Sequence, residues 1–360
     1  MSTQARTNPE IKTIPQTIPK STSPKPIQRQ IKKIAVLTSG GDAPGMNACI
    51  RAVVRAALHH DMRVIGVTQG YKGLIMGADY FKEMKSEDVS NIIHRGGTIL
   101  KSARCEEFKS VEGMKHAYRN LDAHGIDAVI VIGGDGTFTG AREFSGKFNI
   151  PFIGIPGTID NDLANTDFTI GYDTALNTVI EAIDKIRDTA NSHDRLFFIE
   201  VMGRDAGYIA IRTGIACGAE AIIIPEKETN IEELVTTLEK GFLRKKTSSI
   251  IVVAEGYEGD NNQGTFKLSE EVKNKLSPHI QYDIRVTVLG HIQRGGPPTC
   301  KDRVLATRLG VAAVEGLING QRNMMVGLIK RKIVFSSLKN IQKDTGEVTN
   351  ELLRLASIVG

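Results

Sequence analysis

Short β-branched runs alternate with helical patterns along most of the chain, and this alternation limits the possible folds more than any other feature. Residues 34–38, 128–132 and 152–155 read IAVLT, AVIVI and FIGI, and a helical pattern follows each run. Four more strand-like runs come later, LFFIEVM, AIIIP, SIIVVAE and RVTVLG. Such alternation is typical of βαβ units. We therefore predict an α/β fold with mostly parallel sheets.

The length of the chain predicts two domains after an irregular start. Single cores stop growing at roughly 250–300 residues, and this chain has 360. Its first 30 residues carry five prolines among Thr, Ser, Gln and Lys. Such a segment can neither continue a helix nor build a core. We predict a disordered extension over residues 1–30, without a targeting function.

Composition argues against two classes of partner. The net charge is +5, but residues 1–33 hold seven Lys or Arg against one acid, so the remaining body is about neutral. Nucleic-acid binding therefore has little support, and no apolar run is long enough to cross a bilayer. The cysteines form neither CxxC metal pairs nor a small-domain disulfide pattern, which favours the cytoplasm.

The residues that follow the strand-like runs are the candidate site, because ligands of open parallel α/β sheets bind outside the carboxyl ends of the strands. In chain order these segments are Ser39–Asp42, Gly133–Gly136, Gly157–Asp162, Met202–Arg204, Glu255 and His291–Arg294.

The first two of these segments are glycine loops that join a strand to a helix. Without Cβ atoms, their backbone amides can approach phosphate oxygens at the positive end of a helix. Asp135 within GGDG offers a carboxylate to Mg²⁺, which takes one or two carboxylates together with phosphate oxygens and water. The alternative is that the glycines only allow tight turns.

Two other nucleotide-binding classes lack their motifs in this chain. The sequence has no GxxxxGK[ST], and no acid ends a second strand in the arrangement that binds dinucleotides. GGDGT also occurs in NAD kinases and diacylglycerol kinases, so it indicates phosphoryl transfer but does not identify the acceptor.

Residues 156–162, PGTIDND, can supply the base that phosphoryl transfer to an alcohol needs. On an extended segment Asp160 and Asp162 point the same way. One carboxylate can then face the acceptor, and the other a metal-bound water or a loop amide. The alternative role for either acid is to form a turn or cap a helix.

Basic residues at strand ends and in loops predict a site for a second phosphate. We expect them at one edge of a sheet, where the planar guanidinium groups would suit phosphate oxygens. Taken alone, each would be interpreted as a surface residue. They are Arg104, Arg195, Arg204, Arg285, His291 and Arg294.

The motifs, in this order, resemble those of bacterial-type ATP-dependent 6-phosphofructokinases. The resemblance runs from about Lys33 to Leu328 through LTSGGDAPGMN, GY.GL, RGGT.L.SAR, VIGGDGT, PGTIDND, TIGYDTAL, SH.R, EVMGR.AG and VLGHIQRGG. It implies the phosphofructokinase fold, with two Rossmann-like three-layer αβα domains. The larger, ATP- and Mg-binding domain would hold residues 31–171 plus about 292–335, and the fructose 6-phosphate-binding domain residues 172–291. The resemblance does not place residues 336–360.

The resemblance also implies transfer of the γ-phosphoryl of MgATP to the 1-hydroxyl of fructose 6-phosphate by a cytoplasmic homotetramer. Asp160 would be the general base, with Asp162, Thr158, Arg204 and Arg104 as further catalytic residues. Asp135 would be the Mg²⁺ ligand. ATP would be held by Gly40, Tyr71, Arg104, Cys105, Gly134, Asp135, Gly136, Thr137 and Gly140. Fructose 6-phosphate would be held by Thr158, Ile159, Asp160, Met202, Gly203, Arg204, Glu255, His291, Ile292, Gln293 and Arg294, with Arg195 and Arg285 from a neighbouring subunit.

Gly136 and Gly157 favour ATP as the phosphoryl donor. Pyrophosphate-using relatives carry aspartate and lysine at these positions, and either side chain would occupy or repel the space that the α-phosphate and nucleoside need. A pyrophosphate-dependent phosphofructokinase is the alternative within the enzyme class. An inactive sugar-phosphate-binding regulatory subunit is the alternative from another class, against which the presence of Asp160 and Asp135 argues.

Further positions match an effector site of bacterial relatives, which lies between subunits and binds ADP and phosphoenolpyruvate. They are Arg51, Arg55, Arg187, Gly218, Glu220, Arg244 and Lys246. The resemblance therefore implies allosteric regulation, although each charge could equally be a solvated one. Relatives place an effector-binding arginine downstream of Gly73, where Lys85 is the nearest candidate. Cys105 lies where the nucleotide would, and we interpret it as a packing residue, with a reactive thiol as the alternative.

Overall fold

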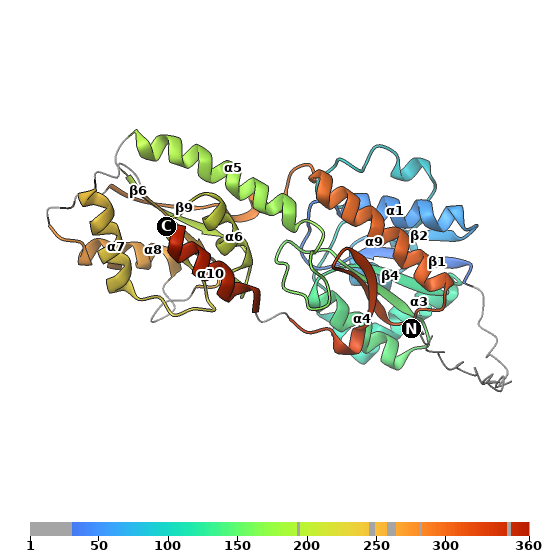
Figure 1. The fold of residues 1–360 in the computed structure, drawn as a ribbon. Helices are drawn as coiled ribbons and strands as arrows, with labels where there is room; N and C mark the ends of the chain where they lie inside the picture. Colours follow the sequence, from blue (N-terminus) through green and yellow to red (C-terminus); the bar gives the residue numbers. More distant parts are fainter. Residues whose placement is uncertain are drawn as a thin grey trace, which may run out of the picture. The chain divides into compact units, whose positions relative to one another are not determined.

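The computed structural model describes residues 31–192, 195–244, 249–257, 264–278, 280, 283–343 and 347–359. The extension predicted for residues 1–30 lies outside them. The described strands form one sheet of seven strands and one of four, with helices packed against both (Figure 1).

The seven-stranded sheet has the order β11-β10-β5-β4-β1-β2-β3. Its inner strands are parallel: β1 (Lys33–Thr38), β2 (Arg63–Val67), β4 (Ala128–Gly133), β5 (Phe152–Pro156) and β10 (Met324–Ile329). The edge strands, β3 (Phe81–Glu83) and β11 (Lys332–Ser337), are antiparallel to their neighbours.

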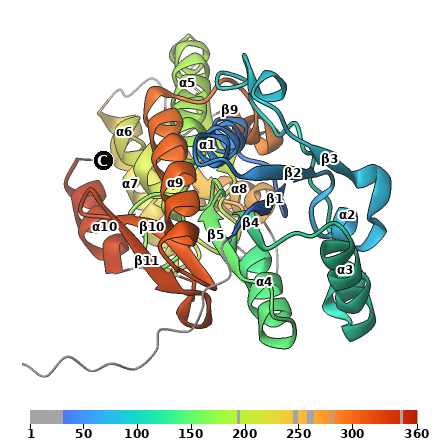
Figure 2. The ribbon, with the colours of Figure 1, turned by 90° about the vertical axis from the view of Figure 1, so that its right-hand side faces the viewer.

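Alternate side chains of β1 point to opposite faces of this sheet, as the two-residue period of a strand requires. Ile34 and Val36 join a core cluster that contains α1 (Met46–His59) and α9 (Cys300–Ile318). Leu37 joins another, which contains residues of α2 (Gly70–Met76), α3 (Val111–Ala123) and α4 (Asp135–Lys147). Figure 2 shows α1 and α9 on one side of the sheet and α3 and α4 on the other. Short 3₁₀ helices span Ala78–Tyr80 (η1), Glu87–Val89 (η2) and Glu107–Lys109 (η3).

The four-stranded sheet is parallel throughout, in the order β7-β8-β6-β9. Its strands are β6 (Arg195–Val201), β7 (Ala221–Ile223), β8 (Ser249–Ala254) and β9 (Asp283–Val288). Phe197 and Ile199 pack in the cluster that contains residues of α5 (Tyr172–Asn191) and α6 (Tyr208–Ala216). Leu196 and Phe198 pack in the cluster of α7 (Ile231–Leu243) and α8 (Gly264–Lys275). The remaining elements are η4 (Gly290–Arg294), η5 (Leu338–Asn340) and α10 (Glu347–Val359), which packs beside α6.

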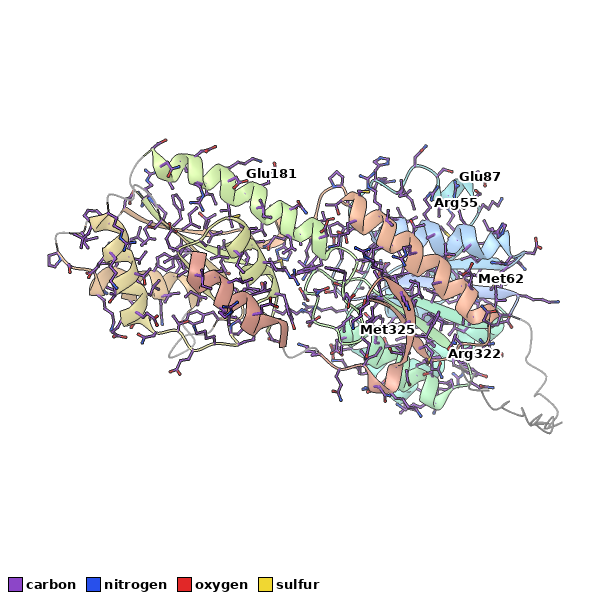
Figure 3. The ribbon with its side chains drawn as sticks, viewed as in Figure 1. Arg55, Met62, Glu87, Glu181, Arg322 and Met325 are labelled. Carbon is purple, nitrogen blue, oxygen red and sulfur yellow. The ribbon has the colours of Figure 1, made fainter. Side chains whose placement is uncertain are left out.

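These two three-layer arrangements confirm the predicted α/β class. The larger sheet takes its strands from residues 33–156 and 324–337, and the smaller from 195–288; the exact domain limits stay a prediction. Met62 and Met325 are buried in the core, whereas Arg55, Glu87 and Glu181 extend from helix and turn surfaces (Figure 3). Among the helices of the described segments, none has the length and apolar character that crossing a bilayer demands.

Asp302, in the first turn of α9, supplies the acceptor that caps α5. It is 1% exposed and accepts hydrogen bonds from the backbone N–H groups of Gly171 (3.0 Å) and Thr174 (2.8 Å) and from the Thr174 hydroxyl (2.5 Å). We expect Asp302→Asn to lower the free energy of unfolding by about 1–3 kcal/mol, because an amide nitrogen would leave buried donors unpaired.

Denaturant unfolding measures this loss, with Asp122→Asn on the exposed face of α3 as the control. Equal unfolding midpoints for the two variants would contradict the capping role.

Candidate active site

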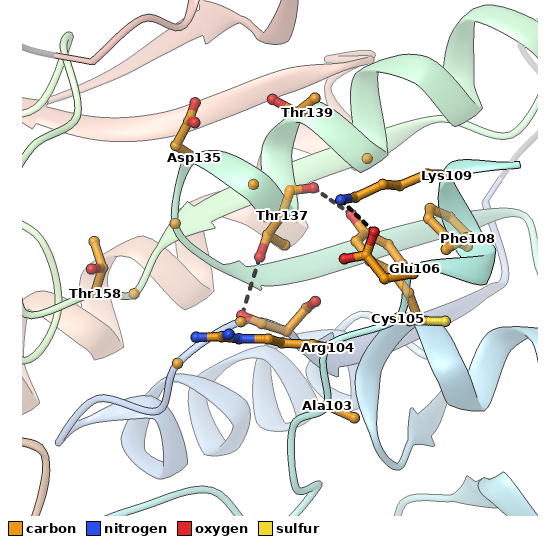
Figure 4. Close-up of a pocket in the computed structure, with 18 of the residues that line it drawn as sticks. Ala103, Arg104, Cys105, Glu106, Phe108, Lys109, Asp135, Thr137, Thr139 and Thr158 are labelled. Carbon is orange, nitrogen blue, oxygen red and sulfur yellow. Dashed lines mark hydrogen bonds and ion pairs between the residues drawn. The ribbon is translucent and has the colours of Figure 1, made fainter. Parts of the chain in front are cut away.

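A cavity of about 610 Å³ opens at the carboxyl ends of β1, β4 and β5. It brings together all of the residues that the sequence predicted for nucleotide, metal and catalysis (Figure 4). Those that line it are Gly40, Tyr71, Arg104, Cys105, Gly134, Asp135, Gly136, Thr137, Gly140, Thr158, Asp160, Asp162, Arg204 and Arg294.

Stacked rings form one wall of the cavity. The centroids of Tyr71 and Phe108 are 4.0 Å apart and their planes differ by 7°. The Tyr71 hydroxyl donates a hydrogen bond to the carbonyl oxygen of Thr137 at the start of α4. A Cβ at Gly140 would come within 2.9 Å of the Tyr71 ring, so glycine allows the helix to lie against it. Cys105 packs against the same apolar cluster.

The first turn of α4 forms another wall. Asp135 begins this helix, and among the described residues no side chain caps it. The Thr137 hydroxyl donates a hydrogen bond to the Ser39 carbonyl (3.1 Å), which joins the loop after β1 to this turn. The positive end of the helix dipole suits a phosphate group.

Asp135 fits a magnesium ion that arrives with phosphate oxygens. In the part of the chain that the structure describes, no cluster of three or more His, Cys, Asp or Glu side chains could hold a metal. One carboxylate on the cavity wall, completed by phosphate oxygens and water, is a common Mg²⁺ ligand set. It would not suit zinc, which takes three or four protein ligands.

Asp160 is a buried carboxylate with one free oxygen. The residue is 2% exposed, and its Oδ2 lies 3.4 Å from Nε of Arg204. Its Oδ1 has no hydrogen-bond partner among the described residues. Burial raises the pKa of Asp160, and the charges of Arg204 and Arg294 oppose that rise. Such a group can accept a proton from a ligand in the cavity.

Asp162 is also buried, at 5% exposure. Burial and the charge of Asp160 raise its pKa, and the charge of Lys343 opposes the rise. The Lys343 ammonium lies 3.9 Å from Asp162 Oδ2. No sequence motif indicated Lys343, which lies beyond the stretch that carries the resemblance.

The loop after β6 is held by hydrogen bonds to its backbone. Glu255 accepts from the N–H groups of Gly203 (3.2 Å) and Arg204 (2.7 Å), and Gln293 from that of Met202 (3.2 Å). Arg204 adopts a left-handed backbone, with φ of 53°, which such contacts stabilise. Glu255 and Gln293 thereby position the guanidinium that reaches Asp160.

Among the residues that do not line the cavity are four that were predicted to bind substrate, Ile159, Arg285, His291 and Ile292. The side chain of Ile159 is wholly buried in the core, so it can offer a ligand only its backbone. His291 and Ile292 are exposed in η4. Arg285 lies within β9 and pairs with Asp283 at 2.9 Å. A role for its guanidinium within this chain's own cavity is not supported.

The expected clustering of all six basic residues at one sheet edge is wrong for Arg195 and Arg285. Arg195 is the first residue of β6 and lies beside Asp283, the first residue of β9. Six residues separate it from the carboxyl end of β6, about 20 Å along a strand. The prediction failed because it grouped residues at either end of a strand, and Arg195 lies at the amino end of β6, opposite the carboxyl edge. The role in a neighbouring subunit stays a prediction.

The predicted effector residues form two separate groups in this chain. Arg51 and Arg55 lie on α1, where burial and the charge of Arg55 lower the pKa of Arg51. The second group surrounds the end of α6: Arg187 donates a hydrogen bond to the Cys217 carbonyl next to Gly218. Glu220 accepts one from the Ile250 N–H at 2.5 Å. Arg244 ends α7, and Lys246 lies outside the described residues.

The cavity is lined by segments that fall within residues 33–317, a stretch that matches the sequence model of the family described as Phosphofructokinase. The chain belongs to this family. The ATP-dependent 6-phosphofructokinase 2 of Bacteroides thetaiotaomicron is 54% identical to this chain over 325 residues, which make up 90% of this chain and 97% of the relative. The ATP-dependent 6-phosphofructokinase of Cytophaga hutchinsonii is 52% identical over 326 residues, 91% of this chain and 97% of that one.

A solved phosphofructokinase shares the fold. The structure of Pichia pastoris phosphofructokinase in the T-state is similar with a TM-score of 0.81 at 38% identity. The match covers 88% of this chain and 36% of the yeast chain, so this chain spans about a third of that protein.

Proposed function

We infer that this chain is an ATP-dependent 6-phosphofructokinase, which transfers the γ-phosphoryl group of ATP to the 1-hydroxyl of fructose 6-phosphate. Bacterial relatives 54% and 52% identical carry that name. Within the chain, the observation that carries the proposal is Asp160: a buried carboxylate with a free oxygen lines the same cavity as the start of α4. A base and a phosphate-binding helix end in one cavity are what the reaction needs.

Asp160 accepts the proton of the 1-hydroxyl as that oxygen forms its bond to the γ-phosphorus. The bond between the γ-phosphorus and the bridging oxygen breaks, so that ADP and fructose 1,6-bisphosphate are the products. Arg204, 3.4 Å from Asp160, stabilises the charge on the transferred group. Arg104 and Thr158 line the same cavity and support this step, as does Asp162.

The nucleotide would bind against the walls of the cavity. Its contacts would be the loops at Gly40 and Gly134–Thr137, the residue Gly140, and the side chains of Tyr71, Arg104 and Cys105. Asp135 would hold the Mg²⁺ that accompanies ATP. Bound there, the ion neutralises charge on the phosphate oxygens.

The sugar phosphate would lie against the loop after β6 and η4, with Met202, Gly203, Arg204, Glu255, His291 and Arg294 as its contacts. Arg195 and Arg285, remote from the carboxyl ends of their own sheet, would serve a neighbouring subunit of a homotetramer. The larger domain (residues 31–171 with about 292–335) would bind the nucleotide, and residues 172–291 the sugar phosphate.

Regulation by ADP and phosphoenolpyruvate in a cytoplasmic enzyme completes the proposal. Its support is the resemblance at the effector positions, of which Arg51 and Arg55 lie on α1 and Arg187, Gly218 and Glu220 lie around the end of α6.

A coupled assay of the purified protein tests the proposal with fructose 6-phosphate and either ATP or pyrophosphate, each with Mg²⁺. Turnover with ATP alone is the expected result. Turnover with pyrophosphate alone would make the enzyme the pyrophosphate-dependent form, and binding of fructose 6-phosphate without turnover would make it a regulatory subunit. If neither ADP nor phosphoenolpyruvate shifts the fructose 6-phosphate saturation curve, the regulatory part fails.

A further inference from the structure

The C-terminal segment 338–343 lies against the loop that carries Asp160 and Asp162. Leu338 and Ile341 are 2% and 6% exposed and share a core cluster with Leu163. Leu163 and Lys343 form an antiparallel bridge, and the Ala164 N–H donates to the Gln342 carbonyl (3.1 Å). Apolar burial and backbone pairing together fix this segment beside the loop.

This placement brings the ammonium group of Lys343 between two carboxylates from different loops. Its Nζ lies 2.8 Å from Asp205 Oδ2 and 3.9 Å from Asp162 Oδ2. The Asp205 side chain is 83% exposed, whereas that of Asp162 is 7% exposed. The exposed pair by itself contributes little, so the contact with the buried Asp162 gives Lys343 its significance.

Lys343 is also the charge that most opposes protonation of Asp162. Burial and the neighbouring Asp160 raise the pKa of Asp162, and among the influences that lower it the charge of Lys343 precedes that of Arg204. Asp205, Asp162 and Asp135 in turn raise the pKa of Lys343. The ammonium group thus offsets part of the negative charge of these three carboxylates.

Two ionic links therefore join the loop after β5 to the loop after β6. One is Arg204 to Asp160, and the other runs from Asp162 through Lys343 to Asp205, the neighbour of Arg204. The second link has its cation on a segment of the chain beyond residues 33–317.

We propose that Lys343 is a positioning residue for phosphoryl transfer: it fixes the positions of the Asp162 carboxylate and of the 203–205 loop relative to Asp160. The proposal rests on the proposed function. Lys343 acts through Asp162 and Asp205 and does not touch the substrate. Displacement of such groups by about 1 Å can lower turnover about 10²-fold.

Lys343→Met keeps the apolar stem and removes the charge. We expect it to lower kcat about 10- to 100-fold and to leave the KM for ATP within about twofold, since Lys343 is not among the residues that line the cavity. Lys343→Arg keeps the charge and is expected to restore most of kcat. Lys339→Met, on the exposed side of η5 in the same segment, is the matched control and should equal the wild type.

Asp205→Asn separates this role from a merely structural one. If the loss of kcat comes from breaking the ionic link from Asp162 through Lys343 to Asp205, the double variant Lys343→Met, Asp205→Asn loses no more kcat than Lys343→Met alone. Additive losses, a loss that arginine does not restore, or a kcat for Lys343→Met equal to that of Lys339→Met would each overturn the proposal. A wild type that is inactive with ATP would instead overturn the proposed function, and the role of Lys343 with it.

Discussion

Asp160→Asn is expected to lower kcat by about 10²- to 10⁴-fold, the usual cost of losing a general base, and to leave fructose 6-phosphate binding nearly unchanged. The amide has the size of the carboxylate and can still accept a hydrogen bond, but it cannot take up a proton. The free Oδ1 is the atom whose basicity is lost. Steady-state kinetics measure kcat, and calorimetric titration measures sugar-phosphate binding in the absence of nucleotide.

The control for this change is Asp122→Asn, on the exposed face of α3. A kcat for Asp160→Asn near that of the control would remove Asp160 from the chemical step. Loss of both kcat and sugar-phosphate binding, with an altered circular dichroism spectrum, would mean that the buried carboxylate is needed for the fold.

The pH dependence of the wild-type enzyme's activity reports the ionisation of Asp160. Burial, the largest influence, raises the pKa of Asp160, while Arg204 and Arg294 oppose the rise. Because the base acts only when ionised, kcat/KM, which reports the groups of the free enzyme, is expected to fall as the pH drops through a pKa above the ordinary range of aspartate. An acid limb in the ordinary aspartate range, measured where circular dichroism shows the fold intact, would contradict this.

The sequence predicts the cavity well wherever a functional residue directly follows a strand. Asp135 and Asp160 follow β4 and β5, which are neighbours in one sheet, and the rule that parallel strands present their carboxyl ends at one edge is enough to bring them together. Arg204 follows β6 of the other sheet, so this rule does not account for its place beside Asp160. The rule never applied to Arg195, because this residue lies at the amino end of β6 and the rule concerns the carboxyl ends of strands.

Contacts that depend on segments far apart in the sequence could not be predicted from motifs. Lys343 reaches Asp162 only because apolar residues of its segment are buried beside Leu163, and nothing in the pattern around residue 343 indicates this neighbour. Likewise one oxygen of Glu255, which the resemblance implied as a ligand for the sugar, accepts hydrogen bonds from the N–H groups of Gly203 and Arg204. A backbone in a left-handed conformation there creates donors that residue types alone do not reveal.

Gly136→Asp is expected to lower kcat/KM for ATP by about 10³-fold, since a carboxylate about 4 Å from a phosphate charge is repelled by about 4 kcal/mol at an effective dielectric constant of about 20. The fold should tolerate the change. A Cβ at Gly136 meets no described atom within 4 Å, and an acid in the first turn of α4 is favoured by the helix dipole. Any loss therefore belongs to the ligand.

Gly146→Asp is the matched control, because Gly146 lies on the same helix, has equally open space around its Cβ and does not line the cavity. Gly157→Lys is a poorer probe of donor choice, since a Cβ at Gly157 would press within 2.8 Å of Ile132 Cγ2 and disturb the core as well. If ATP kinetics of Gly136→Asp equal those of Gly146→Asp, the space beside Gly136 does not hold the phosphates. A loss confined to ATP, with the KM for fructose 6-phosphate unchanged, would place the nucleotide at the start of α4, where Asp135 can reach its metal ion.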